Sequence, residues 1–240
     1  MYTFSGRIRY SETNPEGYLK MESLIDYFQD CSTFQSEDLG IGIEYLAKDH
    51  LAWMVNSWQL EILSLPRLGD RVRIGTSPYE LKGFMGLRNF MLETEDGRRL
   101  VNANSVWSLF NMERGVPARV TDEIAGAYRL APRFEMEYLP RKIRIPKEGG
   151  IPGNEILVTE QFLDSNHHVN NGQYVRLAAA YGPREPLTRL RVEYRKQAYE
   201  GSVIVPVIYE EEAGKTLICL NHPEGETYAA VEMTCAANRE

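Results

Sequence analysis

The densest group of polar side chains in the sequence lies at residues 163–174, directly before a helical pattern. Asp164, Asn166 and His168 stand at alternate positions, so an extended loop would point all three side chains to one side. Histidine can take and return a proton near neutral pH, a carboxylate can orient it or activate water, and an amide can hold a carbonyl or the water. These residue types fit attack of water on a carbonyl carbon without a covalent protein intermediate.

The start of the following helix adds an electrostatic element to this group. Asn170 is a candidate N-cap, and Gln173 three residues later is placed to complete a capping box. The first N–H groups of the helix would then face the loop, where the helix carries about half an elementary positive charge. An oxyanion formed there would be stabilised, although a D-x-N-x-H pattern is also typical of a capped, solvated turn.

Two stretches of helical periodicity are each followed by strand-like runs, which predicts an α+β protein. The helices are expected to end near Gly40 and Gly182. Their apolar faces consist of Leu24, Tyr27, Phe28, Cys31 and Phe34 in the first and of Tyr174, Val175, Leu177, Ala178 and Tyr181 in the second. Strand-like runs cover 58–62, 71–74, 86–95 and 99–111 in the first half, and 156–162, 187–198, 202–211, 215–221 and 226–236 in the second.

Residues 125–153 are rich in proline, glycine and charge, which is typical of a linker between two halves. Because the order strand, polar loop, helix and antiparallel strands occurs on both sides of it, we interpret the chain as a tandem duplication with halves at 1–124 and 154–240. A sheet with one apolar face can bury it around one long helix, and two such sheets can join at their edges. One irregular α+β domain with a long loop is the alternative.

The composition and charge exclude several classes of protein. A net charge of −7 argues against nonspecific nucleic-acid binding, which needs excess Lys and Arg. No segment approaches the ~20 apolar residues of a membrane-spanning helix, and no secretion signal begins the chain, so the cytoplasm is the expected location. Cys31, Cys219 and Cys235 lack C-x-x-C spacing, so we expect reduced, buried thiols and neither a zinc site nor a disulfide framework.

Four segments, in order along the chain, carry a pattern known from one enzyme family. They are Gly86-Leu87-Arg88-Asn89-Phe90, Asn104-Ser105-Val106-Trp107-Ser108-Leu109-Phe110-Asn111, Asp164-Ser165-Asn166-His167-His168-Val169-Asn170-Asn171 and Leu190-Arg191-Val192-Glu193-Tyr194-Arg195-Lys196. The family segments read G-M-R-R-D-W, T-S-x-W-V-M-M-N, D-x-N-x-H-V-N-N and L-x-x-E-Y-R-R. In these segments the chain resembles the plant and bacterial acyl-acyl-carrier-protein (acyl-ACP) thioesterases.

This resemblance implies a tandem, or double, hot-dog fold, with two antiparallel sheets each wrapped around a long helix. It also implies hydrolysis of fatty acyl-ACP thioesters with acyl carrier protein as the partner, and no metal or organic cofactor. By their positions in the D-x-N-x-H motif, the resemblance assigns catalytic roles to Asp164, Asn166 and His168, whereas His167 is expected to be a loop residue only. The candidates for substrate contact are Asn170, Asn171 and Arg88. The equivalent loop at 11–17 lacks histidine, so we expect one reaction centre in the second half and the acyl tail in the first.

The chain departs from the family pattern at Gln197-Ala198, where plant members have Glu-Cys. Gln197 can orient a water but cannot accept its proton, and Ala198 removes a cysteine nucleophile. We therefore expect direct water attack, with Asp164 or His168 as the base and Gln197 as an auxiliary catalytic donor. An acyl-CoA thioesterase, a hot-dog hydratase and an acyl-thioester-binding protein without catalysis are the alternatives.

Acyl carrier protein is acidic, as this chain is, so docking requires a concentrated basic surface. Two groups of basic residues qualify, with ordinary solvated charge as the alternative for each. They are Arg141, Lys142, Arg144 and Lys147 in the linker, and Arg189, Arg191, Arg195 and Lys196 near the reactive strand, with Arg88 as a further candidate. Association into a homodimer is left open.

Overall fold

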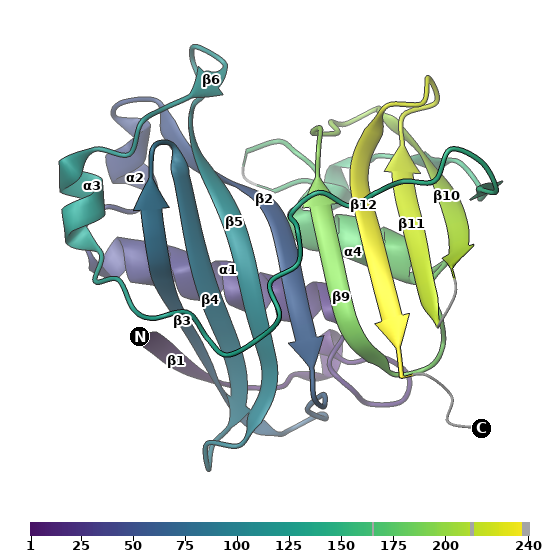
Figure 1. Ribbon diagram of the computed structural model, residues 1–240, viewed down its shortest axis with the longest axis horizontal. Helices are drawn as coiled ribbons and strands as arrows, with labels where there is room; N and C mark the ends of the chain where they lie inside the picture. Colours follow the sequence, from purple (N-terminus) through teal and green to yellow (C-terminus); the bar gives the residue numbers. More distant parts are fainter. Residues whose placement is uncertain (165, 212–213, 237–240) are drawn as a thin grey trace. The chain divides into compact units, whose positions relative to one another are not determined.

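The structure, a computed structural model, describes residues 1–164, 166–211 and 214–236 (Figure 1). The chain forms two compact units, one of Met1–Lys20 with Asp26–Leu139 and one of Met21–Ile25 with Pro140–Glu240. The units divide inside the predicted linker 125–153, and the assignment of separate roles to the two halves stays a prediction. No helix of the described residues is long and apolar enough to cross a membrane.

The first unit contains an antiparallel sheet in the order β1-β3-β4-β5-β2. Its strands are β1 (Tyr2–Arg7), β2 (Leu51–Ile62), β3 (Arg71–Lys82), β4 (Met85–Thr94) and β5 (Arg99–Asn111), and the short β6 (Val116–Pro117) pairs with β5. The tight β3–β4 connection contains Gly83 at φ 64°, a left-handed conformation that favours glycine. The predicted strand runs of this half are confirmed, although β2 begins at Leu51.

Helix α1 (Met21–Asp38) is the long helix, and all of it from Asp26 onward belongs to the first unit, whereas α2 (Ile43–Ala47) and α3 (Asp122–Ala127) are short. Phe28 of α1 packs on Trp58 and Phe90 of the sheet, with ring centroids 6.0 and 5.3 Å away. The helix stops where predicted, since Gly40 follows it at φ 73°. Phe34 differs from the prediction, because it is 44% exposed and contacts Phe4 with its ring edge instead of joining the core.

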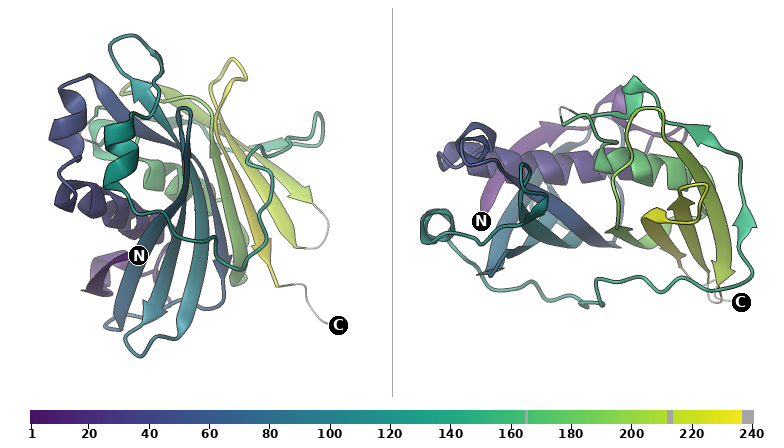
Figure 2. Two further views of the ribbon diagram at one scale, coloured as in Figure 1. Left: turned by 60° about the vertical axis from the view of Figure 1, so that its left-hand side comes forward. Right: turned by 90° about the horizontal axis from the view of Figure 1, so that it is seen from above.

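The second unit repeats this plan with shorter elements (Figure 2). Its strands β9 (Leu187–Tyr194), β10 (Val203–Glu211), β11 (Lys215–Asn221) and β12 (Thr227–Cys235) are antiparallel in the order β9-β12-β11-β10, and β7 (Ile151–Pro152) and β8 (Ile156–Leu157) pair with β10. Helix α4 (Asn171–Ala179) buries Gly172, Tyr174, Val175 and Ala178. The strand predicted at 156–162 is shorter than expected, since a 3-10 turn, η2 (Glu160–Phe162), replaces its second part.

The segment that joins the units is anchored at both ends, although no helix or strand forms between Tyr128 and Gly150. In the first unit, the buried Gln59 donates from Nε2 to the carbonyl of Glu137 (2.6 Å) and accepts from the N–H of Leu139 (3.0 Å). Both bonds use backbone groups of the segment, so this end is fixed without regular structure.

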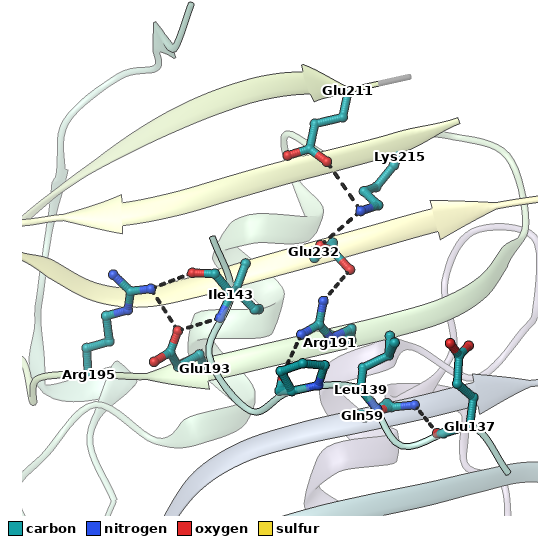
Figure 3. A network of polar contacts seen from close by, with 11 residues as sticks. Gln59, Glu137, Leu139, Ile143, Arg191, Glu193, Arg195, Glu211, Lys215 and Glu232 are labelled. Atoms are coloured by element: carbon teal, nitrogen blue, oxygen red, sulfur yellow. Dashed lines mark hydrogen bonds and ion pairs between the residues drawn. The ribbon is translucent and has the colours of Figure 1, made fainter. Parts of the chain in front are cut away.

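The second unit fixes the segment through the polar network of Figure 3. Buried Glu193 accepts from the N–H of Ile143 (2.9 Å), while Arg195 donates both to Glu193 and to the Ile143 carbonyl (2.7 Å each). Arg191 donates to the carbonyl of Pro140 at 2.7 Å. The Ile143 side chain is buried among Leu217, Cys219 and Ala230. The segment itself crosses the strands of this unit on the face opposite α4 (Figure 2). The predicted linker is therefore a strap clamped to the sheet.

Candidate active site

Asp164 holds the loop before α4 through backbone groups. One carboxylate oxygen, Oδ1, accepts from the N–H of Asn166 (2.8 Å) and from the N–H of His168 (3.4 Å). The Asp164 N–H donates to the His168 carbonyl at 2.8 Å, and His167 takes a left-handed conformation at φ 59° to close the turn. Asp164 thus positions His168 through the main chain, and no bond joins its carboxylate to the imidazole in the described residues.

The first half contains the same loop without the imidazole. Asn14 Oδ1 accepts from the N–H of Tyr18 (2.8 Å), and the Asn14 N–H donates to the Tyr18 carbonyl (2.8 Å). Gly17, at φ 82°, stands where the second loop has His167. Asn14 and Tyr18 therefore correspond to Asp164 and His168, which supports the duplication and shows that an amide can hold this turn as well as a carboxylate.

The start of α4 is capped by Asn170, as predicted. Its Oδ1 accepts from the N–H of Gly172 at 2.7 Å, and its carbonyl accepts from the N–H of Gln173 at 2.9 Å. The predicted capping box is wrong, because the Asn170 N–H donates to the Phe162 carbonyl and the Gln173 side chain accepts from Arg176 instead. The N–H groups of Gly172 and Gln173 are thus already hydrogen-bonded to Asn170. The start of α4 therefore contributes positive electrostatic potential more than unpaired N–H donors.

Three side chains gather beside this loop. The ring of half-buried His168 meets Tyr199 edge-on, with centroids 4.9 Å apart. The Tyr199 hydroxyl donates to Oε1 of Gln197 at 3.4 Å, which leaves the Gln197 amide with its NH₂ group to donate elsewhere. The sequence interpretation missed Tyr199. The available signal was its position two residues after Gln197, where an extended chain presents both on one side.

Ala198 ties the segment after β9 to the loop. Its carbonyl accepts from the N–H of Val169 (3.0 Å), and its N–H donates to the hydroxyl of Tyr174 (2.9 Å). Ala198 and Tyr174 are buried, and burial raises the pKa of Tyr174. The bond between Val169 and Ala198 thus holds the chain neighbours of His168 and Gln197 together.

The three cysteines are all buried and free, as expected. Burial raises the pKa of both Cys31 and Cys219 to about 12 and also raises that of Cys235. A thiol nucleophile needs the opposite shift, toward a stable thiolate. None of these cysteines replaces the one that is missing at Ala198.

The remaining predicted residues lie in different surroundings. Asn166 is exposed at the tip of the loop, and the Asn171 carbonyl accepts from the Tyr194 hydroxyl at 3.0 Å. Arg88 is only 8% exposed and lies in the first unit. Its candidacy for a basic docking surface is therefore wrong, because it is not on the surface.

The basic group near the reactive strand is largely neutralised. Arg191 pairs with Glu232 (2.9 Å), Arg195 with Glu193 (2.7 Å) and Lys196 with Glu226. The linker group, Arg141, Lys142, Arg144 and Lys147, is exposed. Ile143, which lies between these residues, is buried against Leu217, Cys219 and Ala230, and the segment runs on the face of the sheet opposite α4.

Two antiparallel sheets, each with a helix, and a D-x-N-x-H loop before the second helix define a tandem hot-dog protein. Residues 1–128 match the family model described as the acyl-ACP thioesterase N-terminal domain, and the chain belongs to the acyl-ACP thioesterase family.

Relatives and solved structures agree with this assignment. The acyl-[acyl-carrier-protein] hydrolase FATB3 of Cuphea viscosissima is 27% identical over 218 residues, 83% of this chain and 52% of the relative. The chain thus spans about half the length of the curated relatives it matches. The fold matches an acyl-ACP thioesterase from Bacteroides thetaiotaomicron (TM-score 0.88, 20% identity, covering 97% of this chain and 96% of that one) and the 12:0-ACP thioesterase of Umbellularia californica (TM-score 0.81, 18% identity, 98% and 97%).

Proposed function

We propose that the chain hydrolyses fatty acyl-ACP thioesters to free fatty acid and carrier protein. The observation that carries the proposal is His168, held at the start of α4 by the Asp164 turn and flanked by Tyr199 and Gln197. Family membership and the names of the relatives, which include acyl-ACP hydrolases, support the substrate class.

In the proposed mechanism His168 is the general base. Its imidazole takes a proton from a water, whose oxygen forms the new bond to the thioester carbon, and the carbonyl π electrons move to the oxygen. The tetrahedral oxyanion then collapses, the carbon–sulfur bond breaks, and the imidazolium returns the proton to the leaving thiolate. Asn166 Nδ2 and Gln197 Nε2 are the proposed donors to the oxyanion, within the positive potential of α4.

Asp164 is proposed to position His168 and not to act on water. Its Oδ1 is engaged by two backbone N–H groups, and Asn14 makes the equivalent contact in a loop that has no imidazole. The Gln197 side chain cannot serve as the base either, since an amide does not take up a proton near neutral pH.

A matched pair of histidine variants tests the proposal. We expect His168→Asn to lower the release of free thiol from acyl-ACP by about 10²- to 10⁴-fold, the usual contribution of a general base. His167→Asn is the control, because asparagine tolerates the left-handed conformation of the neighbouring position. Wild-type turnover in His168→Asn would contradict the mechanism.

A binding protein without catalysis is the second candidate function, and Gln197 in place of the family glutamate is the observation that favours it. Binding of acyl-ACP without release of free thiol would select it. Comparing one acyl group on carrier protein and on coenzyme A separates the acyl-ACP hydrolase from an acyl-CoA thioesterase. The three free cysteines agree with a reducing compartment, and the cytoplasm is proposed on that ground.

A further inference from the structure

Three polar side-chain atoms of the first unit are buried without a hydrogen-bond partner among the described residues, namely Nε of Arg88, Nε1 of Trp58 and Oγ of Ser77. Nε of Arg88 and Nε1 of Trp58 can only donate, and their side chains are 8% and 2% exposed. Each buried donor that lacks an acceptor loses its hydration without compensation, so two of them in one core call for a physical explanation.

Both donors stand in one row across three strands. Ser105 of β5 is the register partner of Trp58 on β2 and also of Arg88 on β4. Paired residues of neighbouring strands point to the same face, so the two side chains flank Ser105 on one side of the sheet. That side faces α1, because the Arg88 guanidinium donates to Gln35 of α1. Ser105 Oγ already accepts from Trp107 Nε1 at 2.6 Å.

The row carries a positive charge that no carboxylate of the described chain neutralises. The Arg88 guanidinium lies over the rings of Tyr128 (5.3 Å) and Phe90 (5.9 Å), and its hydrogen-bond partner Gln35 is neutral. Cys31 also lies near it, but burial keeps this thiol protonated, so it is no counter-ion. Ring faces and one amide oxygen offset only part of the cost of burying a cation.

We propose that Arg88 and Trp58 form a subsite for an oxygen acceptor, a carboxylate or a hydroxyl, at the distal end of the acyl chain. This inference rests on the proposed function and on the acyl tail occupying the first unit. An unsubstituted alkyl tail leaves both donors unpaired, whereas an oxygenated tail supplies the acceptor. The substrate class is therefore acyl thioesters with an oxygenated terminus.

Hydrolysis of three acyl-ACP thioesters of one chain length tests the subsite. We expect kcat/KM for the ω-carboxy and ω-hydroxy chains to exceed that of the unsubstituted chain by about tenfold or more, as charged hydrogen bonds contribute. Arg88→Met should abolish the preference, and Trp58→Phe, which keeps the aromatic ring, should reduce it. Arg133→Met is the matched control, since Arg133 lies over Tyr79 and Tyr138 (4.8 and 5.2 Å) but is half-exposed and paired with Glu80.

The thermal midpoint separates recognition from a structural role. A cation kept for a ligand is replaced by an apolar side chain at little cost, so Arg88→Met should melt at or above the wild-type temperature without ligand. A large drop in the midpoint together with an unchanged substrate preference would overturn the subsite. If Arg88→Met does not fold, Trp58→Phe carries the test.

Thioether analogues of the same three chains, measured by calorimetry, report binding whether or not the thioester is cleaved. Equal affinity for all three overturns the subsite and leaves the proposed hydrolysis intact. Preference for the oxygenated analogues without any thiol release supports the subsite and refutes the hydrolysis. Inhibition by free unsubstituted fatty acid that disappears in Arg88→Met, without a preference among thioesters, would assign the row to the product carboxylate and overturn the proposal for the distal end.

Discussion

At the residue scale, the role of Asp164 depends on whether its negative charge or only its acceptor oxygen is needed. Asn14 holds the equivalent turn with an amide oxygen. We therefore expect Asp164→Asn to keep the wild-type thermal midpoint and a kcat/KM within about tenfold of wild type, since positioning needs only the acceptor. Asp164→Ala removes the acceptor from two N–H groups and should cost about 1–3 kcal/mol of stability together with more of the activity.

Free-thiol release and thermal melting of both Asp164 variants check this prediction. If Asp164 were the base that activates water, Asp164→Asn would lose about 10²- to 10⁴-fold in kcat while it melted normally. That outcome would move the base from His168 to Asp164.

Tyr199 is predicted to position His168 and Gln197. Its ring meets His168 edge-on and its hydroxyl holds the Gln197 amide. Aromatic edge contacts contribute about 0.5–1.5 kcal/mol, so Tyr199→Ala should lower kcat about two- to tenfold with KM unchanged, and Tyr199→Phe should recover the part due to the ring. Tyr10→Ala, at an exposed tyrosine, serves as the control. A change in KM alone would assign Tyr199 to substrate binding instead.

The sequence was informative where one short segment decides the outcome. The cap at Asn170 depends on neighbours within a few residues, so residue type and spacing were enough to locate it. The extended loop predicted for Asp164, Asn166 and His168 is wrong, because the segment is a turn in which Asp164 Oδ1 accepts from two backbone N–H groups and His167 adopts a left-handed conformation. Tyr199 contacts His168 although the two residues are far apart in the sequence, and the spacing of residue types in one sequence does not predict such a contact. The capping box failed for the same reason, because the Asn170 N–H is taken by Phe162.

At the element scale, periodicity predicted α1, α4 and most strands, but it did not reveal the short α2 and α3 or the clamped strap. The proline- and glycine-rich composition correctly indicated a connecting segment, although the end of α3 and the short β7 fall inside the predicted bounds 125–153. Its anchoring depends on Glu193, which belongs to the family segment Leu190–Lys196 but had no role assigned to it from the sequence. Only the packing of Ile143 against β11 and β12 gives that carboxylate a backbone partner.

We predict that the strap loosens when its clamp is removed. Glu193→Ala deletes bonds to the Ile143 N–H and to Arg195, and should lower the free energy of unfolding by about 2 kcal/mol, because Glu193 is buried while Arg195 is partly solvated. Trypsin should then cleave faster after Arg141, Lys142 and Arg144, read by mass spectrometry.

Cleavage after Lys147, beyond the clamp, provides an internal reference. Glu226→Gln, which breaks the exposed pair with Lys196, should leave both the melting curve and the cleavage pattern almost unchanged. Equal protection of the strap in Glu193→Ala would show that the Ile143 side chain alone holds it.

At the scale of the whole molecule, electrostatics limits how an acidic partner is recognised. The chain carries a net charge of −7, so any attraction for an acidic carrier protein must come from a local group of cations. Arg191 and Arg195 are committed to buried carboxylates and to the strap. Lys196 can exchange its partner at little cost, because both members of its pair with Glu226 are exposed.

Lys196 also directly precedes Gln197, whereas Arg144 lies on the strap, on the face opposite α4. We therefore predict that Lys196→Ala raises KM for acyl-ACP several-fold and weakens its dependence on salt, while Arg144→Ala leaves both unchanged. In the wild type, KM should rise with added salt because screening shortens the reach of surface charge to about 8 Å at physiological ionic strength. An uncharged acyl-pantetheine thioester is the control substrate and should respond to neither variant nor salt. A larger effect of Arg144→Ala than of Lys196→Ala would place docking on the strap, and a salt-independent KM would exclude electrostatic docking altogether.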